Sequence, residues 1–296
     1  MVGVGLPVYN GARFIGQTLD ALLGQSLSDF EVIISDNAST DETPAICAAY
    51  AARDSRIRFL RQPRNLGLPW NWNFVFQQSR GRYFKWAAAN DIFSNNLLER
   101  CVELLQAEPS VVLAFGTTWL LEAEGVDARK YRGAFEVTDE SPAVRYHEIC
   151  SRLGLNSPVS GVVRRQALKN TGLIRPYPGS DVVLMAELAL QGKFRIIGDA
   201  DFFRRVDPMS LSSNRTTAEL WRLHDPAATG SEPIVARMHA DLLMATLRTR
   251  GVPLGGRVAA TYSALRNAIA VRGEIFGEIA GMFGSWWPSQ KIDGPR

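Results

Sequence analysis

The sequence predicts an α/β fold in which a mostly parallel sheet is flanked by helices and followed by a helical C-terminal extension. Three observations predict it. Short apolar segments alternate with amphipathic segments through about residue 110. Polar loops follow four of the apolar segments. From about residue 233 the pattern is helical, with a break near 251–256.

The first part of the chain alternates between predicted strands and predicted helices, which is typical of right-handed βαβ units. The expected strands lie at 2–6, 30–35, 57–60 and 82–87. The expected helices lie at 14–23, 40–53, 69–79 and 95–106. Pro7 is expected to end the first strand. Ser39 and Glu42 have the spacing of a capping box at the start of the second helix.

The pattern loosens after a further strand at 111–115, and residues 122–142 are polar and have no clear assignment. We expect a strand at 159–164, a helix at 165–170, a helix that begins at Ser180 and ends at Gly192, and a strand that begins at 194–197. Residues 207–232 are predicted to be mostly loops.

Composition narrows the class of protein. The chain has 296 residues, is 46% hydrophobic and carries a net charge of +3, so it has a globular composition and no basic run that would favour nucleic acid. Cys47, Cys101 and Cys150 each lie in a predicted helix, which favours separate core thiols and a reducing compartment. A strand begins at Val2, and no apolar run reaches the ~20 residues of a membrane span, so we expect no leader or span.

Four polar loops follow predicted strands, at 7–11, 36–41, 63–67 and 88–91. Because parallel strands end at the same edge of a sheet, these loops are expected to lie together, where open α/β sheets bind ligands. Asp36 and Asn37 could meet a base edge, and Asp91 could hold a hard divalent cation that also binds a diphosphate. The alternative is a set of capping and turn residues, with Asn90 and Asp91 capping the next helix.

Asp181 lies at the start of a predicted helix behind the turn Gly179-Ser180. A carboxylate there could act as a general base towards a substrate hydroxyl, or it could simply cap the helix. The sequence contains no Gly-x-x-x-x-Gly-Lys-Ser/Thr, no Gly-x-Gly-x-x-Gly and no Gly-x-Ser-x-Gly, and it has only three histidines. A P-loop, a dinucleotide fingerprint and a serine triad therefore have little support.

The ordered set of loop motifs resembles the family 2 glycosyltransferases of the GT-A fold. The motifs are Pro7-Val8-Tyr9-Asn10-Gly11, Asp36-Asn37-Ala38-Ser39-Thr40-Asp41, Arg64-Asn65-Leu66-Gly67 and Asn90-Asp91. The resemblance covers residues 2 to about 205. It implies a GT-A-like, Rossmann-type domain at 1–215, with a nucleotide-sugar-binding half at 1–110, an acceptor-binding half at 111–215 and a helical extension at 216–296.

The resemblance also implies an activity. It is that of an inverting, hexosyltransferase-like enzyme of polysaccharide or cell-surface glycan synthesis. The donor would be a nucleotide-diphosphate sugar, most often a UDP-sugar, with Mn²⁺ or Mg²⁺ as cofactor. The acceptor would be a saccharide or lipid-linked hydroxyl. We expect a cytoplasmic enzyme, with peripheral contact at the inner face of the membrane as an open alternative.

Site residues follow from the same resemblance. The nucleotide-sugar pocket would be lined by Pro7, Tyr9, Asn10, Asp36, Asn37, Arg64, Asn65, Gly67 and Asn90. Asp91 would be the metal ligand of the Asp-x-Asp element, and Asp181 would be the catalytic base. The sequence departs from the family at Asn90, which leaves one carboxylate in this element, and at Asp207, near where the family often has a histidine.

Two other functions are open. A nucleotide-sugar or glycan-binding protein without turnover would share the fold, and Asn90 is the feature that favours it. A nucleotidyltransferase would need a Gly-rich, basic loop after the first strand, which Val8-Tyr9-Asn10-Gly11-Ala12 does not provide. The apolar face of the tail is expected to pack on its own domain or on a second copy. The alternative is docking on a membrane surface, given arginines among apolar residues and Trp286-Trp287 at the end.

Overall fold

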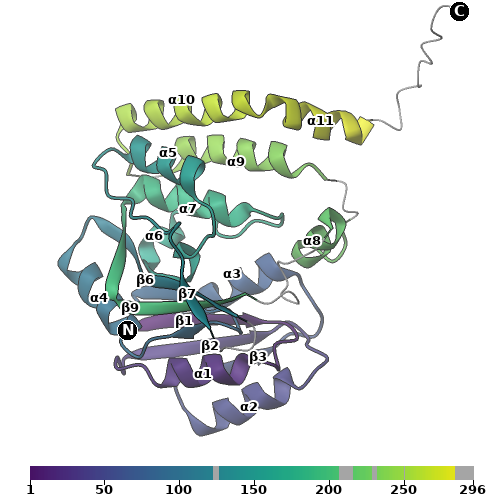
Figure 1. The fold of residues 1–296 in the computed structure, drawn as a ribbon. Helices are drawn as coiled ribbons and strands as arrows, with labels where there is room; N and C mark the ends of the chain where they lie inside the picture. The colour runs from purple at the N-terminus through teal and green to yellow at the C-terminus, as the bar shows by residue number, and fades with distance from the viewer. Residues whose placement is uncertain (123–126, 207–215, 229–231, 250, 284–296) are drawn as a thin grey trace, which may run out of the picture.

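The computed structural model describes residues 1–122, 127–206, 216–228, 232–249 and 251–283. In these residues one nine-stranded sheet has the strand order β3-β2-β1-β4-β8-β6-β9-β5, and β7 pairs with the outer part of β6. Helices cover both faces of the sheet, and further helices are stacked beyond one of those faces (Figure 1). The predicted α/β fold class is confirmed.

The strands are β1 (Val2–Val8), β2 (Phe30–Asp36), β3 (Ile57–Arg61), β4 (Tyr83–Trp86), β5 (Ile92–Phe93), β6 (Val111–Glu122), β7 (Ala128–Lys130), β8 (Val162–Arg164) and β9 (Lys193–Val206). The helices are α1 (Ile15–Leu23), α2 (Thr43–Arg53), α3 (Leu68–Gln78), α4 (Leu97–Ala107), α5 (Pro142–Arg152), α6 (Arg165–Lys169), α7 (Ser180–Gln191), α8 (Thr217–His224), α9 (Ile234–Arg248), α10 (Leu254–Ala270) and α11 (Arg272–Phe283). A short 3₁₀ helix spans Pro158–Ser160.

The sheet is parallel in its first half and mixed in its second. β1 pairs in parallel with both β2 and β4, and β2 pairs in parallel with β3. β8 is antiparallel to β4 and β6, β5 is antiparallel to β9, and β6 and β9 are parallel. The carboxyl ends of β1 to β4 therefore share one edge, which places the four polar loops together.

Pro7 does not end the first strand, contrary to the prediction. β1 continues to Val8, and Pro7 is paired with Ser35 of β2. The Gly5 carbonyl accepts from the Ala87 N–H on the β4 side of β1. Backbone polar groups alternate between the two sides of a strand, so the nitrogen of Pro7, two residues later, points to the same β4 side. Because β4 pairs only with residues 2–5 of β1, no strand in the described part of the chain faces the missing N–H.

Two helix predictions are corrected as well. The capping box does not form, because α2 begins at Thr43 with Glu42 as its N-cap and no side-chain cap bond, while the Ser39 hydroxyl is used by the first loop. The region 207–232 was predicted to be mostly loop, yet it contains α8, which begins with a capping box between Thr216 and Glu219.

Two hydrophobic clusters cover the two faces of the sheet. Val32 and Ile34 of β2 point to one face, among α1, α2 and α4, and Ile33 points to the other. Gly5 lets α3 approach that second face, because a Cβ at this position would lie 2.5 Å from a methyl of Val75. The second cluster continues outwards into the C-terminal helices.

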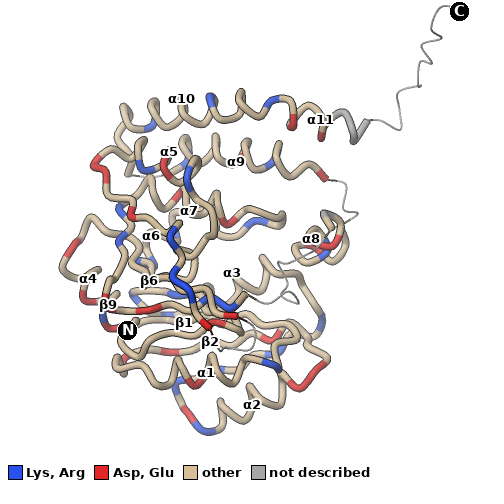
Figure 2. Tube along the Cα trace, viewed as in Figure 1, with Lys and Arg blue, Asp and Glu red and all other residues tan. Residues whose placement is uncertain are grey.

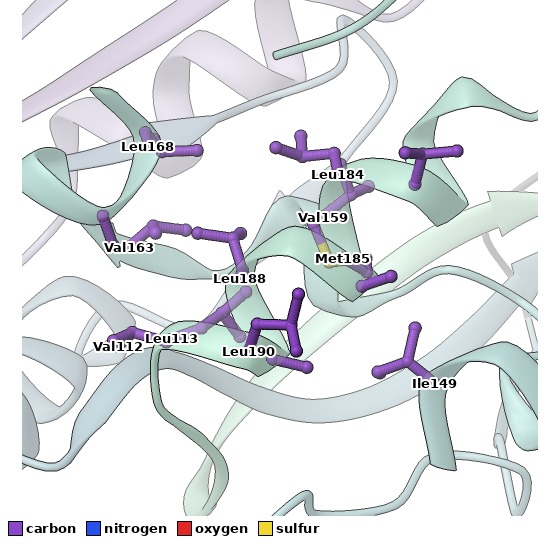
Figure 3. Close-up of a cluster of buried hydrophobic side chains, with 14 of the residues drawn as sticks. Val112, Leu113, Ile149, Val159, Val163, Leu168, Leu184, Met185, Leu188 and Leu190 are labelled. Carbon is purple, nitrogen blue, oxygen red and sulfur yellow. The ribbon is translucent and has the colours of Figure 1, made fainter. Parts of the chain in front are cut away.

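Figure 3 shows the centre of this second cluster, where α7 lies between the sheet and α5. Leu184, Met185 and Leu188 of α7 lie among Leu113 of β6 and Val163 of β8 (Figure 3). Nine residues of α7 between Ser180 and Leu190 are buried, and they lie on both sides of the helix. A helix buried on both sides is expected to be apolar almost all round, as α7 is. The helix is thus fixed firmly, and with it the position of its first turn.

The C-terminal helices are stacked on α7 and α5. α9 packs on α7, and α10 packs on α9 and α5 (Figure 1). Leu242 and Ala245 of α9 and Ala260 and Ala264 of α10 are buried in the same cluster as α7. Within the described residues, no helix has both the length and the apolar character needed to cross a membrane.

Candidate active site

The first two loops are joined by hydrogen bonds at the carboxyl edge of the sheet. The Asn10 N–H donates to Ser39 Oγ at 2.8 Å, and the Thr40 N–H donates to Asn10 Oδ1 at 2.9 Å. The Gly11 N–H donates to Thr43 Oγ1 at 2.8 Å. Asn10 has a φ of +52°, which is uncommon for a residue other than glycine and is best tolerated by asparagine and aspartate. The two loops therefore form one preorganised wall.

Asn37 joins the second loop to the third. Its Nδ2 donates to Asn65 Oδ1 at 2.8 Å and to the Gly67 carbonyl at 3.3 Å, and its Oδ1 accepts from the Leu66 N–H at 2.9 Å. The side chain is buried and its donors face two acceptors. An amide suits this position better than the aspartate that the family more often has, because a carboxylate has no N–H to donate.

Gly67 brings the third loop against the end of α8. Its φ of +87° is a conformation that glycine adopts readily, and a Cβ there would lie 2.4 Å from the His224 carbonyl oxygen. α8 thus covers the loop from the outside, next to α3 (Figure 1). Nothing in the local sequence around Gly67 signals this contact, since the partner lies far along the chain.

Asp36 is buried, and its two carboxylate oxygens have different surroundings. Oδ1 accepts from the Ser39 N–H at 3.0 Å. Oδ2 lies 3.3 Å from Arg61 Nε in an ion pair, but the geometry is not that of a hydrogen bond, so within the described residues this buried oxygen has no hydrogen-bond donor. The atom lacks an N–H partner, and the Arg61 side chain beside it is more than half exposed.

Asp91 follows β4 and is also buried, at 3% exposure. Its Oδ2 accepts from the Ala88 N–H at 3.1 Å. Burial raises the pKa of Asp91 to about 6, against the opposing effects of Lys85 and of the Ala88 N–H, which favour the carboxylate. Lys85 is itself fully buried, and burial lowers the pKa of its ammonium group to about 8. Burial of the Asp91 carboxylate thus outweighs the positive charges of Lys85 and Arg204 that act on it.

These residues fit a divalent cation in one specific way. Mg²⁺ and Mn²⁺ prefer oxygen ligands and often keep water and phosphate oxygens in their coordination sphere. Asp91 is a hard oxygen donor whose charged form is disfavoured by burial, and Asn90 beside it is partly exposed. In the described part of the chain, no group of three or more acidic, histidine or cysteine side chains could hold a metal ion. A cation here would take most of its ligands from a bound diphosphate and water.

Asp181 lies in the first turn of α7, and the N-cap is Gly179 rather than Ser180 or Asp181. Asn156 Nδ2 donates to Asp181 Oδ2 at 2.9 Å, and this is the bond that orients the carboxylate. The Asn156 carbonyl in turn accepts from Arg204 of β9 at 3.5 Å, and Arg204 acts electrostatically on Asp91. Asn156 and Arg204 thereby connect the predicted base to the predicted metal ligand.

His224 lies near the same carboxylate. Burial lowers its pKa, and the Leu220 carbonyl and the charge of Asp181 act in the opposite direction. The Nδ1 atom is 2.8 Å from the Leu220 carbonyl, so Nδ1 carries the proton in the neutral ring and Nε2 is left as an acceptor. α8 therefore brings a neutral imidazole to the edge shared by the third loop and Asp181.

The structure places the predicted site residues at one edge but with different accessibility. Pro7, Asp36, Asn37, Gly67 and Asp91 are buried. Tyr9, Asn90 and Asp181 are partly exposed, and Asn10, Arg64 and Asn65 are exposed. The roles assigned to these residues stay predictions. Asp207 lies outside the described residues.

Four residues that belong to this edge were not predicted as site residues: Arg61, Asn156, Arg204 and His224. Arg61 could have been found, because it ends the third strand just before the third loop. The others lie far from the loop motifs in the sequence and reach the edge only through β9, α8 and the turn before the 3₁₀ helix.

The sequence profile of Glycosyl transferase family 2 matches residues 4–171, which contain all four loops and Asn156. The chain belongs to glycosyltransferase family 2. The predicted family is confirmed, and with it the assignment of the fold to the GT-A class.

Curated relatives of this family-2 chain are similar over its first part. They include "Glycosyltransferase GlyG" of Streptococcus pneumoniae serotype 4, 26% identical over 113 residues, covering 38% of this chain and 38% of the relative. "Chondroitin synthase" of Escherichia coli is 28% identical over 125 residues, covering 42% and 18%. "Uncharacterized glycosyltransferase EpsJ" of Bacillus subtilis is 35% identical over 103 residues, covering 35% and 30%. The chain thus spans less than two fifths of the length of these relatives.

Solved structures are similar over nearly the whole family-2 chain. Residues 1–349 of S. aureus TarS in complex with UDP-GlcNAc have a TM-score of 0.62 at 15% identity, covering 91% of this chain and 72% of that one. The mannosyltransferase PcManGT from Pyrobaculum calidifontis, in complex with GDP-Man and Mn²⁺, has a TM-score of 0.52 at 16% identity, covering 97% and 80%. At this identity the likeness supports the fold alone.

Proposed function

We propose that this protein is an inverting glycosyltransferase that moves a hexose from a nucleotide-diphosphate donor, a UDP-sugar, to a hydroxyl of a saccharide or lipid-linked acceptor. The observation that carries the proposal is that the first three loops of one sheet edge are hydrogen-bonded to one another, while Asn156 and Arg204 connect a separately oriented carboxylate, Asp181, to Asp91 in the fourth loop. A donor pocket and a base are the two parts that such a transfer needs.

The donor pocket is proposed at the first three loops. The nucleobase of the donor would lie between Tyr9 and the wall formed by Asn65 and Gly67, which Asn37 holds in place. An N–H of the nucleobase would donate the hydrogen bond that Asp36 Oδ2 lacks. Arg64 is exposed beside this wall and would contact the diphosphate.

Asp181 is the proposed general base. It would accept the proton from the acceptor hydroxyl as that oxygen attacks the anomeric carbon and the nucleoside diphosphate leaves from the opposite face. Asn156 holds one carboxylate oxygen, which leaves the other for the acceptor. His224, neutral at its lowered pKa, would add no positive charge beside Asp181.

Asp91 is the proposed metal ligand, with Asn90 next to it. When bound, Mn²⁺ or Mg²⁺ would neutralise charge on the leaving diphosphate. Arg204, which acts on Asp91 and bonds to the Asn156 carbonyl, would add a fixed positive charge at the same edge. TarS was crystallised with UDP-GlcNAc and PcManGT with GDP-Man and Mn²⁺, which supports a nucleotide-sugar donor and a divalent metal here.

The test combines binding with turnover. UDP, TDP, GDP and CDP are titrated by calorimetry with Mn²⁺, with Mg²⁺ and with a chelator, and Asp181→Asn is then assayed for transfer. We expect metal-dependent binding of one nucleotide, UDP, and a loss of transfer of at least 10³-fold in Asp181→Asn with UDP affinity unchanged. Retained transfer in that variant would remove Asp181 from the role of base. No binding of any nucleotide would contradict the transferase function itself.

A second function, binding of a nucleotide sugar without turnover, is favoured by one observation: Asp91 is a single, buried carboxylate beside Asn90. It predicts nucleotide binding with no transfer on any acceptor in any metal.

We propose a role in polysaccharide or cell-surface glycan synthesis, and a cytoplasmic location in keeping with three free cysteines.

A further inference from the structure

The outer surface of α10 and α11 carries large apolar side chains that face away from the protein. We call these seven residues the outer stripe, and they are between 38% and 78% exposed: Leu254, Val258, Tyr262, Leu265, Ile269, Phe276 and Ile279. Their separations of three, four and seven residues place them on one side of the helices. They therefore form a continuous apolar strip, on the layer of the molecule farthest from the sheet (Figure 1).

The polarity of α10 is the reverse of that of an ordinary surface helix. The face that packs against α9 and α5 is made of small residues, Ala260, Ser263 and Ala264, all of which are buried. A surface helix normally turns its large apolar residues inwards and its small or polar residues outwards. Burial in this protein thus does not explain the large residues of the outer stripe, and an exposed apolar patch of this kind indicates a binding surface.

The outer stripe is held in a fixed position. α11 is attached to the start of α9 by the Glu278 carboxylate, which accepts the N–H groups of Ile234, Val235 and Ala236 at 3.0 to 3.2 Å. At the other end, Arg257 donates to the carbonyls of Val252 and Thr249. The two helices present the outer stripe as one rigid face.

The charges beside the α10 part of the outer stripe are all of one sign. Residues 242–273 include five arginines and no acidic residue. Arg266 and Arg272 lie on the exposed side of α10 and at the start of α11, beside the apolar residues. Figure 2 shows basic positions along α10, and acidic positions only in α11 beyond them. An apolar strip edged with arginines is complementary to a surface that is apolar inside and anionic outside.

A second copy of the chain fits this face less well. A two-fold axis through the middle of the outer stripe, which runs from Leu254 to Ile279, would bring Arg266 of one copy against Arg266 of the other. Residues 242–273 around this pair have no acidic side chain to neutralise it, and like charges at the centre of an interface oppose association.

We propose that the outer stripe docks the protein on a bilayer of anionic phospholipid, with α10 and α11 lying in the plane of the headgroups. The apolar residues enter the acyl boundary, and Arg266 and Arg272 contact the phosphates. α11 extends towards the side of the molecule on which α8 lies (Figure 1). The proposal does not depend on the proposed activity, because vesicle binding needs neither donor nor acceptor.

The test is co-sedimentation of the full chain with vesicles of pure phosphatidylcholine and with vesicles containing 30% phosphatidylglycerol. One variant removes apolar surface (Tyr262→Ser, Leu265→Ser, Ile269→Ser), and one removes charge (Arg266→Gln, Arg272→Gln). The control is Val144→Ser, which removes from α5 one apolar side chain that is 42% exposed, close to the 45% of Leu265. Unfolding midpoints check that all three variants fold.

We expect the unchanged protein and the control to bind anionic vesicles at least tenfold more tightly than neutral ones. The apolar variant should lose at least tenfold on both, and the charge variant about 25-fold on anionic vesicles only, at about fivefold for each arginine. The absence of vesicle binding, or equal binding of the apolar variant, would overturn the proposal. So would a dimer in light scattering that the apolar variant dissociates, because the face would then belong to a second copy.

Discussion

Replacing Asn37 by aspartate tests how the donor pocket is held together. The two side chains have the same shape, so packing is unchanged, and the bond from the Leu66 N–H to Oδ1 is kept. The two bonds that Nδ2 donates, to Asn65 Oδ1 and to the Gly67 carbonyl, are lost, and a carboxylate oxygen then faces both acceptors. Two net hydrogen bonds contribute about 1 kcal/mol each. The Asn65 Oδ1 and Gly67 carbonyl acceptors keep their bonds from the Gly67 and Asn71 N–H groups, but the new carboxylate oxygen is buried without a donor, which costs about 1 to 3 kcal/mol more.

The expected loss is therefore about 4 kcal/mol in the free energy of unfolding, or about 8 °C in Tm. It should shrink as the pH falls from 8 to 5. Facing two acceptors raises the pKa of the new carboxyl group, so the folded state binds its proton more readily than the unfolded state, and protonation restores a donor. Urea unfolding followed by tryptophan fluorescence measures the loss, and calorimetry with UDP measures the pocket.

Asn95→Asp is the matched control, because it makes the same substitution at an exposed position with no side-chain bond among the described residues. It should change stability by less than about 0.5 kcal/mol. An Asn65→Ala background should remove part of the penalty of Asn37→Asp, since one of the two opposing acceptors is gone. If Asn37→Asp unfolds at the same urea concentration as the unchanged protein at pH 8, the amide does not hold the third loop as described.

Three further predictions concern α7, α8 and the residues bound to them. Asn156→Ala should lower kcat about tenfold with the donor KM unchanged, because the Asp181 carboxylate loses its orienting bond, and a change in donor KM alone would contradict this positioning role. Glu187→Gln should lower the free energy of unfolding by about 3 kcal/mol, because the mostly buried Arg175, 2.6 Å from Glu187, loses its nearest anion. Chemical denaturation measures this loss, and a loss below about 0.5 kcal/mol would refute the prediction. His224→Gln should reduce the fall in stability on acidification, seen as a smaller drop in Tm between pH 7.5 and 5. Burial lowers the His224 pKa in the folded state, so the unfolded state binds the proton first and stability is lost as the pH falls below about 6.5; an identical drop in both proteins would contradict this.

The sequence by itself determined the features that depend on local pattern. Apolar segments of strand length separated by amphipathic ones predict the βαβ units, and the residues at the strand ends predict the loops. Loops that follow successive parallel strands must share an edge, so the joint placement of Asn10, Asp36 and Asn65 could be derived before any contact was known. The family followed from the order of the same motifs.

The tertiary structure decided everything that depends on which segments meet. The second half of the sheet mixes β8 and β5, which are antiparallel, with the parallel pair β6 and β9. Pro7 was read as a strand end because its missing N–H is local information, whereas the absence of a strand beside it is not. α8 was missed because a short helix in a polar region has little periodicity, and its contact with Gly67 is long-range.

Burial and facing were likewise decided only by packing. Asp36 ends β2 and Asp91 follows β4, both where the sequence turns polar, yet both are buried, which the polar sequence around them does not indicate. The sequence of α10 shows that apolar residues recur on one side, but it cannot say which side meets α9. The small residues Ala260 and Ala264 take that contact since they let the helices approach closely, and the large residues are left facing outwards.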